Sequence, residues 1–396
     1  MSLDLTRLRD DTPGVENRLH LNNAGAALCP EPVLAAVREH FELEGRIGGY
    51  EAADARGEAI RSVYREVALL VEAQPHQIAL MEHATSAFVA ALSAVPFRNG
   101  DVLLTTRHDY VSNQIQYLSL ARRLGVEVVR APDGPDGGVD VDGLRELIYR
   151  RRPRLVAMSH VPTNSGLVQD VAAVGRICRE RDTLFLVDAC QSVGQMPVDV
   201  TETGAHFLSA TARKFLRGPR GAGFLWVSDE ALDMGLEPLF PDLRGADWIE
   251  PDLYQPAPGA TRFETWEFAW ALVLGLGAAA RYARQVGLER IQRRSRALAD
   301  QLRLQLARVP GIQVLDRGRE RCAIVTVAVD GRDPAELVRE LRRQGINTSA
   351  VTRESAVLDF DEKGVSGALR LSPHYYNTEA EIETAVQALE TLARGS

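Results

Sequence analysis

Short apolar runs alternate with amphipathic segments through the first two thirds of the chain, and this alternation restricts the possible folds most. Four runs have the length of strands, at residues 101–106, 126–130, 154–159 and 183–188. Helix-like segments lie between them or before them, at residues 33–45, 56–71, 115–124 and 171–181. Strands that alternate with helices run parallel in one sheet, with the helices packed over it. The pattern therefore predicts an α/β fold.

The pattern changes after about residue 265. A mostly helical stretch reaches residue 309, and short strands, a helix and a strand near Leu369 follow before a final helix at residues 379–394. Because a single core stops growing near ~250 residues, a chain of 396 residues is expected to divide. We predict a large α/β domain at 15–264 and a small α+β domain at 265–396, with residues 1–14 packed on the small one. Residues 236–262 are rich in Pro, Gly and Asp, which predicts irregular loops.

Lysine is almost absent from this chain. Of 46 basic residues only Lys214 and Lys363 are lysines, so that 44 are arginines. Arginine stays protonated in proteins, whereas a lysine amine can lose its proton and act as a base or form a Schiff base. Chemistry that needs an amine thus has two candidates, and Lys363 lies in a charged turn.

Charge and cysteine content exclude several classes of function. The net charge of −8 argues against a nucleic-acid or anionic-membrane partner. The longest apolar stretch, residues 268–280, is well short of the ~20 residues that span a bilayer, and the N-terminus has no apolar signal core. The four cysteines show no metal-ligand spacing. We expect reduced thiols, no metal and a cytoplasmic protein.

The most informative segments surround Lys214. Asp188 ends an apolar strand, Gln191 follows three residues later, and Lys214 lies on a loop before a glycine-rich turn at residues 218–223. Open α/β sheets bind ligands at the carboxyl ends of their strands. Pyridoxal phosphate chemistry needs a lysine to hold the cofactor and a carboxylate to keep the ring nitrogen protonated. Residue types alone leave a surface lysine and a helix-capping aspartate equally open.

The longer motifs favour the cofactor. The segments D-A-C-Q-S-V-G at residues 188–194 and S-A-T-A-R-K-F-L-R-G-P-R-G-A-G-F-L at residues 209–225 resemble the fold-type I pyridoxal-phosphate enzymes of the class V aminotransferase family. That family includes cysteine desulfurases, carbon-sulfur lyases and isopenicillin N epimerase. The resemblance implies a mostly parallel seven-stranded sheet flanked by helices, pyridoxal 5'-phosphate as cofactor, an amino-acid substrate and a homodimer with active sites at its interface.

The resemblance also assigns roles to residues of these segments. Lys214 falls on the Schiff-base lysine, Asp188 on the partner of the ring nitrogen and Gln191 on the contact to the phenolic oxygen. Thr211 and Arg213 fall on two phosphate-binding positions. Arg213 replaces the family's usual histidine, and a guanidinium suits an anion site.

Two upstream segments match further cofactor contacts. Thr85 and Ser86 lie in a segment that resembles the phosphate loop leading into a helix, where backbone amides bind phosphate. A plain helix cap explains these two residues equally well. Tyr110, in the segment 108–113, takes the place of the histidine that stacks on the cofactor ring. This exchange keeps an aromatic face but removes an imidazole that could carry protons.

Three other positions concern the substrate or the partner subunit. Asn164, in the loop at residues 160–166, corresponds to the asparagine that contacts cofactor and substrate, although Thr163 fits the position equally well. Arg370, in the segment L-R-L-S-P-H-Y-Y-N-T at residues 369–378, corresponds to the arginine that binds the substrate α-carboxylate. Thr265 stands where desulfurases bring a threonine from the partner subunit to the phosphate.

The choice of reaction depends on an absence. A cysteine desulfurase of this family needs an accessible nucleophilic cysteine on a loop of the small domain. Residues 347–359 contain none, and Cys322 begins an apolar strand where we expect it to be buried. We therefore favour a carbon-sulfur β-lyase acting on cysteine or a cysteine conjugate. Transamination and then epimerisation are the alternatives, and a binding protein without catalysis is least favoured because Lys214 is present.

Overall fold

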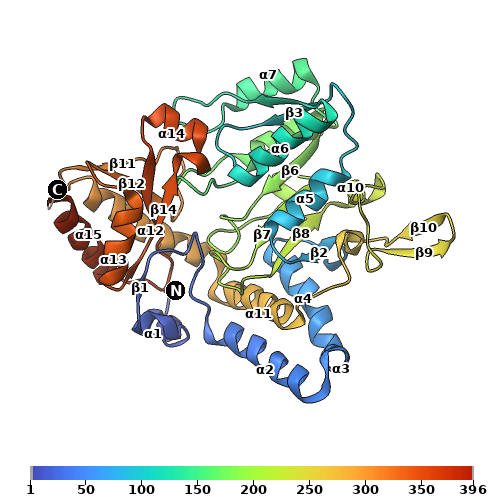
Figure 1. Cartoon of the computed structure of the whole chain (residues 1–396), viewed down its shortest axis with the longest axis horizontal. Helices are drawn as coiled ribbons and strands as arrows, with labels where there is room; N and C mark the ends of the chain where they lie inside the picture. The colour runs from blue at the N-terminus through green and yellow to red at the C-terminus, as the bar shows by residue number, and fades with distance from the viewer. Residues whose placement is uncertain (1–2, 395–396) are drawn as a thin grey trace.

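The computed structural model describes residues 3–394, so residues 1–2 of the predicted N-terminal segment and residues 395–396 of the predicted small domain lie outside it. A seven-stranded sheet with the order β2-β8-β7-β6-β5-β3-β4 forms the larger part (Figure 1). Strands β3 to β7 are parallel, and β8 is antiparallel to both its neighbours. This confirms the predicted α/β class. The strands are β2 (Ile78–Met81), β3 (Val102–Thr105), β4 (Glu127–Arg130), β5 (Leu155–Ser159), β6 (Leu184–Asp188), β7 (Phe207–Thr211) and β8 (Gly223–Val227).

Helices bury both faces of this sheet. Successive residues of a strand belong to separate apolar clusters, as Phe185 and Leu186 of β6 do, because side chains alternate between the faces of a sheet. Strands buried on both faces are apolar throughout, which is why the sequence shows continuous apolar runs. One face is covered by α5 (Ala84–Ala94) and α6 (Val111–Leu124), and the other by α4 (Gly57–Leu70), α7 (Val141–Arg151) and α8 (Val171–Glu180).

A four-stranded antiparallel sheet forms the smaller part, with the order β11-β12-β15-β14. Its strands are β11 (Ile312–Val314), β12 (Val325–Val329), β14 (Ser349–Thr352) and β15 (Gly367–Leu371). The helices beside it are α12 (Leu288–Leu306), α13 (Pro334–Arg343), α14 (Val357–Lys363) and α15 (Glu379–Arg394). One apolar cluster continues from the large sheet into this region, so the two parts share a core.

The N-terminal segment lies beside the smaller sheet. It contains α1 (Leu5–Asp10) and β1 (Leu19–His20), and β1 pairs in parallel with β13 (Ile346–Asn347). Arg9 donates to the Tyr376 carbonyl at 3.0 Å and pairs with Glu381 at 2.9 Å. The chain then runs into α2 (Glu31–Ile47) and α3 (Gly49–Ala55), and α11 (Trp270–Val286) packs on α2 and α4. Short helices complete the fold at α9 (Val200–Thr203), α10 (Asp229–Asp233) and four 3-10 turns, residues 13–16, 75–77, 260–263 and 353–355.

A hairpin replaces part of the predicted loop region. Within residues 236–262, β9 (Ala246–Glu250) pairs antiparallel with β10 (Leu253–Pro256), and the hairpin projects from the body of the protein (Figure 1). The prediction of irregular structure was wrong here because Pro251 lies in the turn and Pro256 at a strand end. Proline is tolerated at both kinds of position, so its presence did not exclude strands.

Candidate active site

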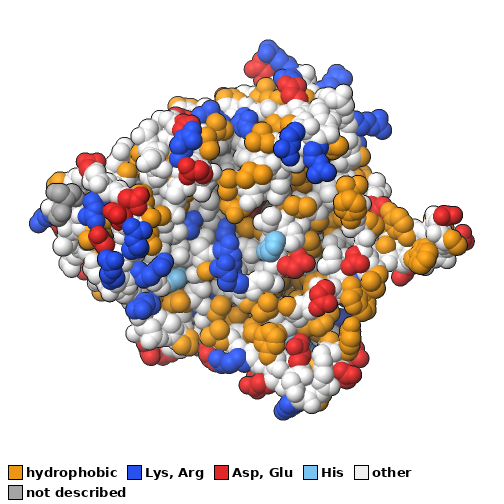
Figure 2. Space-filling view, viewed as in Figure 1, with side chains coloured by type: hydrophobic (Ala, Val, Ile, Leu, Met, Phe, Trp, Pro, Cys, Tyr) orange, Lys and Arg blue, Asp and Glu red, His pale blue; other side chains and the backbone are white. Residues whose placement is uncertain are grey.

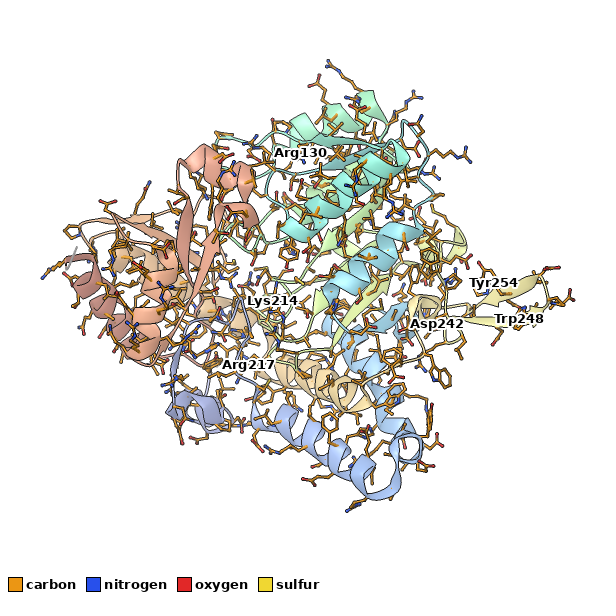
Figure 3. The ribbon with its side chains drawn as sticks, in the orientation of Figure 1. Arg130, Lys214, Arg217, Asp242, Trp248 and Tyr254 are labelled. Atoms are coloured by element: carbon orange, nitrogen blue, oxygen red, sulfur yellow. The ribbon has the colours of Figure 1, made fainter. Side chains whose placement is uncertain are left out.

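The carboxyl ends of the central strands bring the predicted cofactor residues together. Asp188 is the last residue of β6 and Thr211 the last of β7, and Lys214 follows three residues later. Figure 3 shows Lys214 near the centre of the molecule. Because parallel strands end at the same edge of a sheet, segments distant in sequence meet here, as the predicted ligand position requires.

Lys214 is buried beside Tyr110. Its residue surface is 7% exposed, and its Nζ atom lies 5.7 Å from the centroid of the Tyr110 ring. Burial lowers the pKa of the Lys214 amine, the Cys190 thiol and Asp188 oppose this change, and Arg213 lowers the pKa further. More of the amine is therefore neutral near pH 7 than in an exposed lysine, and a neutral amine can attack a carbonyl.

The loop after Lys214 is held by Arg217. This residue adopts the left-handed conformation, with φ of 62°, and its backbone N–H donates to the Lys214 carbonyl at 2.9 Å. Its side chain is 1% exposed and donates to the Leu28 carbonyl at 2.8 Å, and to the Thr12 and Tyr375 hydroxyls at 2.6 Å each. The position of the lysine loop thus depends on the N-terminal segment and on the segment after β15.

Asp188 is a buried carboxylate whose hydrogen bonds orient it. It is 6% exposed, its Oδ2 accepts from Asn113 Nδ2 at 3.1 Å, and its Oδ1 accepts from the Cys190 backbone N–H at 2.9 Å. Within residues 3–394 it forms no ion pair. A buried carboxylate without a cation is costly, and a protonated ring nitrogen would supply the missing charge.

Arg370 and Arg213 are cations that lack an anion. Arg370 on β15 is 6% exposed and donates to the carbonyl and hydroxyl of Thr163 at 2.9 and 2.7 Å, while its Nε is buried without a partner. Burial lowers the pKa of Arg370 to about 10, with Arg213 contributing. Arg213 donates to the Gly25 carbonyl. Arg370 is buried and Arg213 is partly buried, and cations in such surroundings need compensation, so these residues fit a ligand that carries a phosphate and a carboxylate.

Thr163 rather than Asn164 joins this network. The Gln191 Nε2 donates to Thr163 Oγ1 at 2.9 Å, and the Gln191 Oε1 is buried without a partner. The Asn164 side-chain amide instead donates to Asp359 Oδ2 at 2.7 Å. The two residues that the sequence could not separate therefore have different surroundings, and Thr163 is the one that contacts both Gln191 and Arg370.

The N-terminus of α5 lies next to Thr211. Thr211 pairs with Gly223 across β7 and β8, and a Cβ atom at Gly223 would lie 3.1 Å from the His83 backbone. Only glycine permits this close approach. The His83 Nδ1 accepts from the Ser86 backbone N–H at 3.0 Å, so one amide of the predicted phosphate loop already has a partner. Thr85 and Ser86 are half-buried at the helix start, where phosphate binds readily.

Thr265 lies outside the site of its own chain. It is exposed, whereas the preceding Glu264 is buried, pairs with Arg244 at 2.6 Å and accepts from the Leu80 N–H at 2.8 Å. Its assignment to the site of a partner subunit stays a prediction.

Lys363 differs from the expectation of a simple charged turn. It ends α14, and its buried Nζ donates to Asp359 Oδ2 at 2.8 Å. That expectation was wrong because the i,i+4 spacing of a helix places the two charges side by side. The second lysine therefore has a structural partner, and Lys214 alone is beside Asp188.

Sequence reasoning gave no role to two residues of the site, Asp109 and Asn113. Asp109 is 6% and Asn113 2% exposed, and Asn113 contacts both Asp109 and Asp188 at 3.1 Å. Their i,i+4 spacing at a helix start was visible in the sequence, but it did not reveal that both face Asp188.

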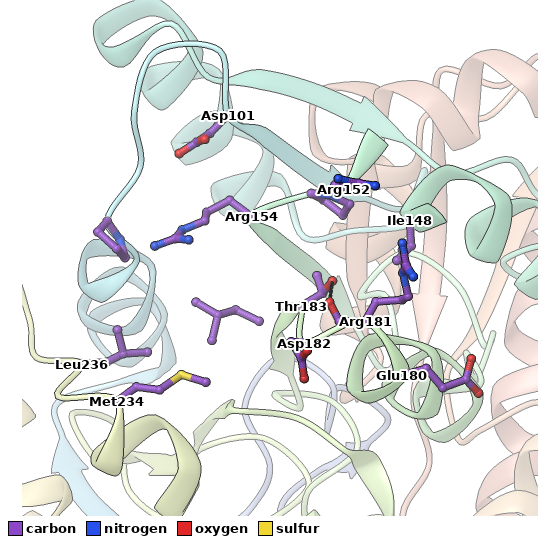
Figure 4. A pocket seen from close by; sticks show the side chains of 13 residues that line it. Asp101, Ile148, Arg152, Arg154, Glu180, Arg181, Asp182, Thr183, Met234 and Leu236 are labelled. Carbon is purple, nitrogen blue, oxygen red and sulfur yellow. Dashed lines mark hydrogen bonds between the residues drawn. The ribbon is translucent and has the colours of Figure 1, made fainter. Parts of the chain in front are cut away.

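A pocket of about 720 Å³ lies at the opposite edge of the sheet (Figure 4). Its lining includes Asp101, Arg154 and Thr183, which immediately precede β3, β5 and β6. It is therefore separated from Asp188 and Thr211 by the length of the strands. Within residues 3–394 no helix is both long and apolar enough to cross a membrane, and no three His, Cys, Asp or Glu side chains form a possible metal site.

A buried lysine, a strand-end aspartate and unpaired cations on this fold define a pyridoxal-phosphate-dependent enzyme. The family model of aminotransferase class-V matches residues 19–385, and the chain belongs to that family. When bound, pyridoxal 5'-phosphate supplies an electron sink for negative charge at the substrate α-carbon. Lys214, Asp188, Gln191, Thr211 and Arg213 would hold it.

Known relatives cover almost the whole chain. A probable cysteine desulfurase of Methanothermobacter thermautotrophicus is 30% identical over 399 residues, covering 98% of this chain and 97% of that protein. A probable hercynylcysteine sulfoxide lyase of Mycobacterium tuberculosis is 29% identical over 373 residues, covering 94% and 89%. The solved apo structure of a cysteine desulfurase from Thermococcus onnurineus NA1 matches with a TM-score of 0.91 at 26% identity, covering 100% and 99%.

The lowered pKa of Lys214 predicts how cofactor capture depends on pH. Only the neutral amine attacks the cofactor aldehyde, so the rate of capture by the apoenzyme should rise with pH and level off below 10.5, the ordinary lysine value. Stopped-flow absorbance after mixing with pyridoxal phosphate measures this rate. A rate that still rises at pH 10.5 would contradict the effect of burial.

Borohydride reduction identifies the amine in the same samples. The chain has two lysines, so mass spectrometry needs to distinguish only two peptides. The reduced cofactor should be attached to Lys214, and attachment to Lys363 would overturn the assignment.

Proposed function

We propose that this protein is a carbon-sulfur β-lyase that acts on cysteine or a cysteine conjugate. The observation that carries the proposal is the state of its thiols. Protein surroundings raise the pKa of all four cysteines, Cys190 and Cys322 to about 12. A persulfide-forming desulfurase needs a low-pKa, accessible thiol, and residues 347–359 offer none. The relatives named above are a probable cysteine desulfurase and a probable sulfoxide lyase, and these names support cleavage of a carbon-sulfur bond. The raised pKa values of the thiols favour cleavage without a protein thiol.

The residues of the site are suited to this reaction. The Arg370 guanidinium binds the substrate carboxylate as a planar fork, and Thr163 fixes that guanidinium from the other side. The Lys214 amine would hold the cofactor and is placed to accept and return the substrate α-proton. Asp188 would bond to the protonated ring nitrogen of the cofactor, whose ring supplies the electron sink. A thiol at the β-carbon then leaves without help from a second nucleophile.

The assembly we infer is a homodimer. Large apolar side chains are exposed on the β9–β10 hairpin and in the segment before it, including Trp248 at 80% and Phe240 at 85%. Tyr50 on α3 is also exposed, at 74%. Figure 2 shows hydrophobic side chains gathered over the hairpin, where Figure 3 marks Trp248 and Tyr254. Exposed apolar surface of this kind is typical of interfaces between subunits. The exposed Thr265 would then reach the phosphate of the partner's site. All four cysteines are free, which suits a reducing cytoplasm.

Products distinguish the lyase from other reactions. The holoenzyme incubated with cystine and S-substituted cysteines should release pyruvate together with a thiol or persulfide, because elimination at the β-carbon leaves an unsaturated amine that hydrolyses. Lactate dehydrogenase coupling measures the pyruvate. If these substrates only convert the cofactor to its pyridoxamine form, the enzyme is an aminotransferase.

Arg370 provides a test of substrate binding. Arg370→Ala should raise KM about tenfold to a hundredfold, because a charge-assisted hydrogen-bonded pair is lost, while cofactor content remains unchanged. Steady-state pyruvate release and cofactor absorbance give both quantities. Arg154→Ala, at the opposite edge of the sheet, is the matched control and should behave as wild type. Equal loss of cofactor and activity in Arg370→Ala would contradict the role.

The dimer is tested by sedimentation. Wild-type protein at micromolar concentration should have twice the mass of one chain. The double variant Trp248→Asp, Phe240→Asp should be monomeric, because a dimer would bury two unpaired carboxylates at its interface. Leu304→Asp, at a side chain 63% exposed on α12, is the control and should stay dimeric. A wild-type monomer would refute the assembly.

A further inference from the structure

Asp109 is a buried carboxylate that the proposed reaction does not use. It precedes α6 and accepts hydrogen bonds from five donors. They are the Tyr110 backbone N–H and the Ser159 hydroxyl, both at 2.7 Å, the Tyr117 hydroxyl at 2.8 Å, the Thr105 hydroxyl at 3.0 Å and the Asn113 amide at 3.1 Å. Within residues 3–394 it has no cationic partner. This many donors fix one orientation of the carboxylate and compensate its charge.

Asn113 connects this carboxylate to the cofactor site. It lies one helical turn after Asp109, and its Nδ2 is 3.1 Å from Asp109 Oδ1 and 3.1 Å from Asp188 Oδ2. An amide nitrogen has two hydrogens, so both are donated and no freedom to rotate remains. The position of the Asp188 oxygen is thereby tied to Asp109, which is itself tied to β3, β5 and α6.

Asp109 also fixes the residue on the other side of the site. The Tyr110 backbone N–H donates to Asp109 Oδ1, and the Tyr110 ring lies 5.7 Å from Lys214 Nζ. One buried carboxylate therefore bonds to the backbone that carries the aromatic ring and, through Asn113, to the strand-end acid. Burial raises the pKa of Asp109, and the nearby Asp188 adds to this rise, so the two negative charges are close enough to interact.

We propose that Asp109, acting through Asn113, is a positioning residue that fixes the Asp188 carboxylate against the cofactor ring nitrogen and the Tyr110 ring against the cofactor face. The proposal rests on the cofactor roles of Asp188 and Tyr110. The pair does not touch the cofactor. With Asn113 bonded to one Asp188 oxygen and the Cys190 N–H to the other, the carboxylate has a fixed orientation. Cofactor binding then does not have to order that carboxylate.

Asn113→Leu tests the link in the full-length enzyme, because leucine has the same branched arrangement of side-chain heavy atoms without the amide donors and leaves Asp109 with four donors. The dissociation constant for pyridoxal phosphate should rise about tenfold, since one hydrogen bond to a charged group orders Asp188. The visible circular dichroism of the bound cofactor should weaken, because its ring is held less rigidly. Gln114→Leu is the matched control. It removes the next amide of α6, which contacts Arg130 and not Asp188, and should leave both measurements unchanged.

Asp109→Asn tests the charge. With cofactor labelled by 15N at the ring nitrogen, NMR follows loss of the ring proton, and this loss should occur about one pH unit lower than in wild type. Asp133→Asn, at a largely buried carboxylate beside His108, is the control. If Asp109→Asn does not fold, the measurements on Asn113→Leu alone test the proposal. Cofactor affinity and circular dichroism equal to those of the wild type in Asn113→Leu would overturn it. These measurements need no substrate, so their outcome is separate from that of the pyruvate assay.

Discussion

The burial of Arg217 is the interaction on which the active site depends. Its guanidinium joins the N-terminal segment at Thr12, the lysine loop and the segment after β15 at Tyr375. A left-handed backbone at a residue other than glycine costs roughly 1 kcal/mol or more, and such conformations persist only where the surroundings enforce them. Buried hydrogen bonds to a charged group exceed that cost. Lys214 is therefore held by contacts from three distant parts of the chain.

Among residues 3–394, the site contains cations that lack an anionic partner and an acid that lacks a cationic partner. Arg213 and Arg370 both lower the pKa of Lys214, Arg213 also lowers the pKa of Arg370, and neither arginine has a carboxylate partner in the part of the chain that the structure describes. Asp188 is a buried acid without a cation. Such an arrangement is unfavourable by itself and becomes favourable with a ligand that carries anionic groups at two ends and a protonated nitrogen between them. The folded chain thus has the charge pattern that its cofactor and an amino acid complement.

Two site residues were predictable as candidates because strand ends and lysine scarcity are local properties. Asp188 ends an apolar run and Lys214 precedes a glycine-rich turn. The role of Arg370 came only from the resemblance of its segment to the family motif. The sequence could not decide whether Thr163 or Asn164 contacts the cofactor site, because adjacent loop residues point in different directions. The structure decides it, since Thr163 contacts Gln191 whereas Asn164 contacts Asp359. The β9–β10 hairpin was missed because its strands are exposed and lack a buried face to impose alternation.

The sequence by itself determined the α/β class, the order of its elements and the position of one acid at the end of an apolar strand. These features follow from periodic apolar burial, which is encoded within a few residues of each position. Tertiary structure alone decided that Asn113 contacts both Asp109 and Asp188 and that Arg217 joins three segments. Each of these depends on the direction of a side chain across a fold, and a pattern along one chain does not specify such directions.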